Sequence, residues 1–106
     1  MSFIYFKFNI GHDEMPLLVK IGGTKDYKSR SAQHLTSGSC YLIVYDTNLT
    51  DTFREVEAGI KCDYADERHY NEEYYYTQGM ICATAKSHNL KLVYLCILLN
   101  FIMTTS

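Results

Sequence analysis

The chain has 106 residues, which is enough for one domain with a modest hydrophobic core and too few for two. Apolar residues make up 47% of the chain and charged residues 21%, a composition that argues against wholesale disorder. The net charge of −2 argues against an overall basic nucleic-acid binder, although residues 1–45 are slightly basic and residues 46–76 are strongly acidic.

The cysteines and the termini suggest a cellular compartment. Four widely spaced cysteines form no C-x-x-C pair, so we expect reduced, mostly buried thiols rather than a zinc site or a disulfide framework. The N-terminus lacks the pattern of a signal peptide. The apolar run 92–103 spans about 12 residues, whereas a membrane-spanning helix needs about 20. We therefore expect an intracellular protein, in the cytoplasm or nucleus, without a membrane partner.

The first third of the chain predicts a hairpin followed by a helix. Residues 3–8 are β-branched and aromatic and predict a strand, and residues 17–21 predict a second strand. The polar connection between them favours antiparallel pairing. Gly22 and Gly23 are expected to end the second strand, with a positive φ allowed. Asp26 is a plausible N-cap for a helix over 27–35.

The remaining elements follow from hydrophobic periodicity. Residues 40–45 predict a third strand, and apolar side chains at three- and four-residue steps predict a helix over 52–64. Glu72 and Glu73 are taken as the start of a helix over 72–87. The stretch 91–102 fits either a strand or a helix. The order predicts a single α+β domain over 1–106, with a small three-stranded antiparallel sheet flanked by helices.

A constellation of polar residues follows these elements. Tyr27, Arg30 and His34 would lie on one face of the first helix. The whole order resembles the GIY-YIG nuclease family, in the short variant found in phages and large DNA viruses. The resemblance covers residues 3–76. Its pieces are Phe3-Ile4-Tyr5, Lys20-Ile21-Gly22 followed by Thr24, Arg30-x-x-x-His34, Val56-Glu57, and Glu72-Glu73-Tyr74-Tyr75 with Arg68 in the spacer.

The resemblance implies a metal-dependent endonuclease that hydrolyses phosphodiester bonds of DNA. Glu57 would hold one Mg²⁺ or Mn²⁺ ion, because a single carboxylate with several waters is an ordinary Mg²⁺ site. Arg30 would contact the scissile phosphate, since its guanidinium is permanently charged and fork-shaped. Tyr5 would act as a base or orient the attacking water. His34 would donate to the nucleophile or the phosphate.

Two positions depart from the family pattern. Lys20 replaces the second signature tyrosine, and Phe3 replaces the first glycine. Lys20 could act as a base only if burial made it neutral. Otherwise its positive charge could lower the pKa of Tyr5, and Arg30 could do the same. The residues expected to contact the nucleic acid around this site are Gly22, Thr24, Lys25 and Lys28.

Other interpretations remain open. The chain could be a catalytically weak nucleic-acid-binding module that keeps the fold, or an interaction protein that forms a homodimer through its apolar segment 91–106. RNA is not distinguished from DNA. Individually, Tyr5 could be a core aromatic, Lys20 an edge-strand charge that opposes aggregation, and Glu57 the partner of Lys61 in a surface ion pair. The nuclease interpretation requires Tyr5, Lys20, Arg30, His34 and Glu57 to meet in one cleft.

Overall fold

The computed structural model describes residues 1–9, 17–35, 40–48 and 53–98, with the side chains at 31, 32, 34, 35 and 96–98 left out. The elements in chain order are β1 (Phe3–Asn9), β2 (Leu18–Thr24), α1 (Tyr27–Leu35), β3 (Cys40–Asp46), α2 (Arg54–Asp63), the 3-10 turn η1 (Ala65–Glu67), β4 (Arg68–Tyr70), β5 (Glu73–Tyr75), α3 (Met80–Ser87) and β6 (Lys91–Leu98).

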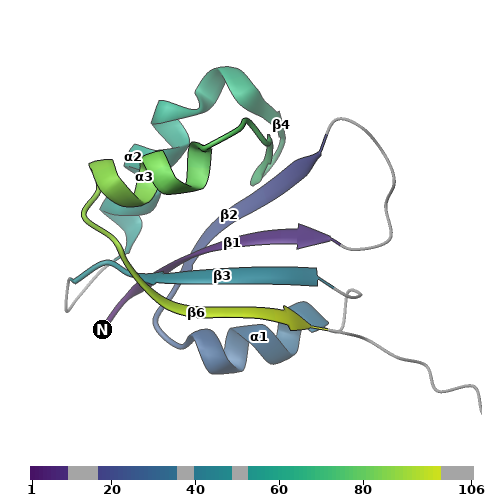
Figure 1. The fold of residues 1–106 in the computed structure, drawn as a ribbon, viewed down its shortest axis with the longest axis vertical. Coiled ribbons are helices and arrows are strands. Elements are labelled where there is room, and N and C mark those ends of the chain that lie inside the picture. Colours follow the sequence, from purple (N-terminus) through teal and green to yellow (C-terminus); the bar gives the residue numbers. More distant parts are fainter. Residues whose placement is uncertain (10–16, 36–39, 49–52, 99–106) are drawn as a thin grey trace, which may run out of the picture.

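The strands form one sheet in the order β4-β5-β2-β1-β3-β6, and each neighbouring pair is antiparallel (Figure 1). The predicted α+β class and antiparallel sheet are confirmed. The predicted sheet is too small, since the three expected strands β2, β1 and β3 form only its centre. The hairpin β4–β5 extends one side and β6 the other, which decides the stretch 91–102 in favour of a strand up to Leu98. Residues 99–102 lie outside the described part.

The helix predicted over 72–87 is wrong in its first half. Residues Glu73–Tyr75 form β5, and α3 begins only at Met80, after Gly79 with a φ of 78°. The physical reason is a long-range contact. Tyr74 pairs with Val19 of β2 and is buried, so this stretch covers the edge of β2 rather than starting a helix.

Gly22 and Gly23 do not form the expected turn. Both lie inside β2, opposite Tyr5 and Ile4 of β1, and β2 continues to Thr24. Among the described glycines only Gly79 has a positive φ. The two glycines of β2 instead provide room for aromatic rings from other elements.

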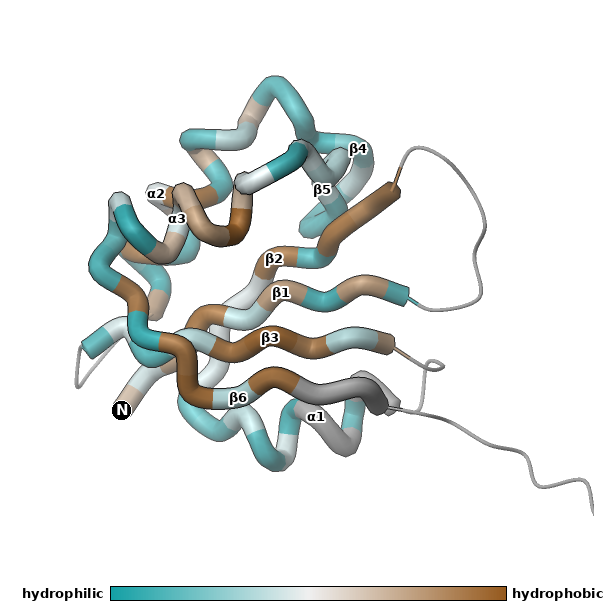
Figure 2. Tube along the Cα trace, viewed as in Figure 1, coloured by the Kyte–Doolittle hydropathy of each residue, from teal (hydrophilic) through white to brown (hydrophobic). Residues whose placement is uncertain are grey.

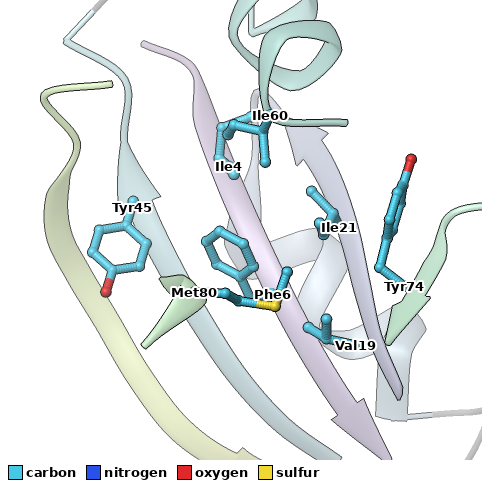
Figure 3. Packing of buried hydrophobic residues seen from close by; sticks show 8 residues of the cluster. All are labelled: Ile4, Phe6, Val19, Ile21, Tyr45, Ile60, Tyr74 and Met80. Atoms are coloured by element: carbon cyan, nitrogen blue, oxygen red, sulfur yellow. The ribbon is translucent and has the colours of Figure 1, made fainter. Parts of the chain in front are cut away.

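Alternate residues of β1 point to opposite faces of the sheet and enter two different clusters. Ile4 and Phe6 pack with Ile60 of α2 and Met80 of α3 in the larger cluster (Figure 3). The other face carries the smaller cluster Phe3, Tyr5, Leu42 and Val44, with Tyr27 of α1 packed against it. Accordingly, β2 and β3 are largely hydrophobic along their length, while the chain from the end of α2 to the β4–β5 hairpin is mostly hydrophilic (Figure 2).

Two further expectations concern cysteines and membranes. Cys40 is buried, as expected, but Cys62 and Cys82 are exposed, and all three are free thiols. The side chain of Cys96 lies outside the described residues. Within the described ranges, no helix has the length and apolar character needed to cross a bilayer.

Candidate functional site

The ring of Tyr5 lies across the backbone of β2. Tyr5 is directly opposite Gly22 in the β1–β2 register. A Cβ atom at Gly22 would overlap the Cζ and hydroxyl end of the Tyr5 ring, so only glycine leaves the ring this position. Tyr5 is 5% exposed. The glycine therefore lets a buried tyrosine reach over the neighbouring strand with its hydroxyl end.

Helix α1 brings Arg30 to the same face of the sheet. The ring of Tyr27 packs against Phe3, with centroids 4.9 Å apart, and against Tyr94, at 5.4 Å. The predicted cap is confirmed, because the Ser29 N–H donates to Asp26 Oδ1 at 3.2 Å. Arg30 follows Tyr27 by three residues and is exposed, and its Nη1 donates to Gln33 Oε1 at 3.2 Å.

Helix α2 supplies Glu57. The ring of Phe53, just before α2, lies where a Cβ of Gly23 would be, so the second glycine admits the start of this helix. The Glu57 side chain is 16% exposed and accepts a hydrogen bond from Lys61 Nζ at 2.8 Å. The pair expected from the i, i+4 spacing is therefore present.

Glu72 connects this pair to β2, and the sequence interpretation did not place it in the site. The Ile21 N–H donates to the backbone oxygen of Glu72 at 3.1 Å, which fixes Glu72 beside β2. Its carboxylate lies 3.6 Å from Lys61 Nζ and 3.7 Å from Lys20 Nζ. The four side chains thus alternate in sign in the order Glu57, Lys61, Glu72, Lys20.

Charged residues from different elements act electrostatically on the Tyr5 hydroxyl. Burial and the negative charge of Glu72 raise the pKa of Tyr5 to about 12, the positive charge of Arg30 opposes them, and Glu57 raises the pKa further. The three charged residues that act on one phenol come from α1, α2 and the turn before β5. At neutral pH the phenol is therefore protonated and can donate a hydrogen bond.

Lys61 is held in its charged form. Burial lowers its pKa, but the hydrogen bond to Glu57 and the charges of Glu57 and Glu72 outweigh burial and raise the pKa overall. Lys61 is therefore a fixed cation between two carboxylates rather than a candidate base.

An open pocket of about 700 Å³ lies beside this chain of charges. Its lining is Lys20, Lys61, Arg68, Asn71, Glu72 and Glu73. Arg68 is oriented by a hydrogen bond from its Nε to the backbone oxygen of Asn71 at 2.9 Å. Lys61, Arg68 and Glu72 were each visible in the sequence, but the assignment of 72–87 to a helix hid their approach to β2.

The structure brings together Tyr5, Arg30 and Glu57 of the predicted catalytic set, with Lys20 joined to them through Glu72. The side chain of His34 lies outside the described residues, and only its backbone is placed, in α1. Of the expected nucleic-acid contacts, Gly22 lies beneath Tyr5. The others are Thr24, which is buried and accepts from the Asp26 N–H at 3.1 Å, and the exposed Lys25 and Lys28.

The donor set is compatible with a hard divalent cation. Carboxylate oxygens are the ligands that Mg²⁺ prefers, and the ion keeps several waters when few side chains bind it. Glu57 and Glu72 supply two carboxylates on either side of Lys61. In the described ranges no group of three or more His, Cys, Asp or Glu side chains gathers, so a protein-only cage of that kind is not present there.

Comparisons of this chain with protein-family models, with curated proteins and with solved structures give no match. The resemblance to the GIY-YIG family therefore rests on the sequence motifs alone.

Proposed function

We propose that this protein is a divalent-metal-dependent endonuclease of the GIY-YIG type that hydrolyses phosphodiester bonds of DNA. One observation carries the proposal. An arginine of α1, a glutamate of α2 and a second glutamate beside β2 all act electrostatically on the hydroxyl of one buried tyrosine. Phosphodiester hydrolysis requires a phosphate-binding cation, a metal-binding carboxylate and a hydrogen-bond donor, and these three side-chain types surround one hydroxyl here.

Each side chain has a role that its geometry supports. Arg30 is exposed and permanently charged, so it binds the phosphate whose bond is cleaved. Glu57 holds the Mg²⁺ or Mn²⁺ ion, which when bound supplies Lewis-acid activation of water and of the phosphate. Tyr5, with its pKa at about 12, donates a hydrogen bond to the water or to a phosphate oxygen and does not act as the base.

Lys20 has a different role from the tyrosine that the family carries at this position. Its Nζ lies 3.7 Å from Glu72, so Lys20 offsets the charge of that carboxylate and adds positive potential beside the phosphate. Lysine is not required as the general base, because a metal ion held by Glu57 would supply the activation of water. The proposal extends to His34 only through its position one turn after Arg30 in α1.

Cleavage of supercoiled plasmid and of a labelled single strand, with and without Mn²⁺ or Mg²⁺, tests the proposal. We expect cutting that needs the metal and is lost in Glu57→Gln and Arg30→Ala. Glu55→Gln on α2 and Lys86→Ala on α3 are the controls, since both residues are exposed and neither belongs to the proposed site, and both variants should retain activity. A folded wild type that binds DNA without cutting it would reject catalysis and leave a nucleic-acid-binding module.

A second candidate, a homodimeric interaction protein, is supported by β6. This strand is at the edge of the sheet, next to β3, and Leu92, Val93 and Leu95 on it are exposed. An antiparallel edge strand can pair with its own copy about a two-fold axis. Sedimentation velocity tests this: Leu95→Lys, at a side chain that is 64% exposed, should convert a dimer to monomer. A wild type that is monomeric at high concentration rejects it.

A further inference from the structure

Four residues form a row of cross-strand partners from the centre of the sheet to its edge. Lys7 of β1 is opposite Lys20 of β2, Lys20 is opposite Glu73 of β5, and Glu73 is opposite Tyr70 of β4. Directly opposite residues share one face of a sheet. Lys7 lies two residues after Tyr5 on β1, so the row is on the face that carries Tyr5.

The row ends at a tyrosine that fold stability does not explain. Tyr70 is 68% exposed, and all three residues of β4 are exposed. A three-residue strand at a sheet edge buries little and contributes little to the core. Exposed tyrosine offers a flat aromatic face to solvent, as residues that stack on nucleobases do.

Several contacts fix the hairpin that presents Tyr70. Asn71 adopts a left-handed φ of 52°, which asparagine tolerates in a tight turn. Arg68 Nε donates to the Asn71 oxygen across that turn. On the two strands, His69 Nδ1 and the Tyr75 hydroxyl are 2.8 Å apart, with ring centroids 5.2 Å apart. The hairpin therefore holds Tyr70 in a restricted position, which lowers the entropic cost of binding.

The charge of the adjoining pocket contrasts with its surroundings. Residues 46–76 are strongly acidic, yet the pocket is lined by three cations, Lys20, Lys61 and Arg68, and by two carboxylates. Lys7, opposite Lys20 in the row, is buried and does not line the pocket. Lys20 belongs to both the row and the pocket, so the pocket's cations adjoin the row that ends at Tyr70, and such cations can bind a phosphate backbone.

We propose that this row and pocket bind an unpaired nucleic-acid strand next to the cleaved bond: Tyr70 stacks on a nucleobase, and Lys20 and Arg68 bind the phosphates between that base and Tyr5. The inference rests on the proposed nuclease function and specifies its substrate as a strand with at least one unstacked nucleotide. A base inside a continuous duplex shows only its edges to the grooves, so Tyr70 has no face to stack on there.

Fluorescence anisotropy in EDTA measures binding without cleavage. The two probes are a labelled single strand of roughly 15 nucleotides, about the site size of a small single-strand binder, and a blunt duplex of the same sequence. We expect the single strand to bind more tightly. Tyr70→Ala should weaken its binding about 5- to 150-fold, the range for losing one stacked base, whereas Tyr70→Phe should keep it. Arg68→Ala should weaken binding and reduce the salt slope by about 1.

The controls are Tyr41→Ala on β3 and Lys91→Ala on β6. Both residues are exposed, and both strands lie toward the other edge of the sheet from β4. Both should bind as wild type does. Binding that is unchanged in Tyr70→Ala, equal affinity for the duplex, or absence of single-strand binding by folded wild type would each overturn the inference. The binding assay needs no metal, so the two proposals can fail separately. If binding depends on Tyr70 but the protein does not cut DNA, only the nuclease function is rejected. If the protein cuts DNA with metal but binding does not depend on Tyr70, only this inference is rejected.

Discussion

The hydroxyl end of the Tyr5 ring occupies the space that a side chain at Gly22 would need, so the ring from β1 lies directly over the backbone of β2. The two residues are direct partners in the β1–β2 register. This contact explains a glycine inside a strand, where it costs stability through its backbone freedom. It also places the phenol where Glu57, Glu72 and Arg30 act on it.

We expect Gly22→Ala to lower the free energy of unfolding by about 1–3 kcal/mol, the usual cost of overpacking a filled space. Urea unfolding followed by circular dichroism measures it. In a Tyr5→Ala background the same substitution should cost much less, because the overlapping ring is gone. An equal cost in both backgrounds would mean that the ring is not the obstacle.

Gly59→Ala is the matched control for that experiment. Gly59 lies within α2, and the nearest atom to an added Cβ is His88 Cε1 at 3.3 Å, on an exposed contact that can shift. Alanine is favoured over glycine inside a helix by about 1 kcal/mol. We therefore expect Gly59→Ala to be neutral or stabilising, opposite in sign to Gly22→Ala.

The charges around Tyr5 lead to a second expectation, on its titration. Glu72→Gln should lower the pKa of Tyr5 from about 12, since it removes the largest charge that raises it, and Arg30→Ala should raise the pKa. An NMR titration of the ¹³Cζ resonance of tyrosine, assigned with Tyr5→Phe, measures both. Glu67→Gln should leave the resonance unchanged, and shifts of the same sign in Glu72→Gln and Arg30→Ala would contradict the site geometry.

The same pKa predicts how stability depends on pH. The folded pKa of Tyr5 lies above its ordinary value of 10.0, so the folded state holds the proton more tightly than the unfolded chain. This contribution to stability is complete below pH 10 and is lost as the pH rises from 10 to 12. Tyr5→Phe should therefore lose less stability than wild type over that interval, in urea unfolding at each pH.

Local signals were sufficient for much of the fold. The Asp26 cap and the polar stretch after it locate α1 at Tyr27–Leu35, and the apolar steps around Ile60 locate α2. The failures have a common cause. Whether Glu73–Tyr75 is strand or helix depends on pairing with β2, a partner more than 50 residues away. Hydrophobic periodicity in the sequence carries no information about such long-range strand pairing.

In the candidate site, too, residues with a local sequence signal were predicted, and those whose roles depend on long-range strand pairing were not. Tyr5, Arg30 and Glu57 could be identified because their types and order resemble a known pattern. Glu72 belongs to the same pattern, but no role in the site could be assigned to it, because that role follows from the hydrogen bond between the Ile21 N–H and its backbone oxygen, which requires β5 to be a strand. The function of Gly22 was likewise mistaken, since the ring that requires it comes from another strand.

A fourth expectation concerns the N-terminus, which is fixed by a buried polar pair. The Ser2 and Thr47 hydroxyls are hydrogen-bonded, and both Thr47 N–H and Thr47 Oγ1 reach the Ser2 oxygen, at 3.1 and 3.0 Å. Thr47→Val should lower the free energy of unfolding by about 1–3 kcal/mol, because it leaves buried Ser2 without this bond. The exposed Thr77→Val should change it by less than about 0.5 kcal/mol, and a similar loss at both positions would argue against the pair.

The last expectation concerns Lys61, whose ammonium lies 2.8 Å from Glu57 and 3.6 Å from Glu72. Lys61→Met leaves two carboxylates facing each other without a cation. We expect a loss of about 1–3 kcal/mol at pH 7, between the values for exposed and buried pairs. Adding Glu57→Gln should restore most of the lost stability, because it removes one of the two facing charges. Urea unfolding at pH 7 decides: no rescue by Glu57→Gln would show that Lys61 stabilises the protein by packing its aliphatic stem rather than through its charge.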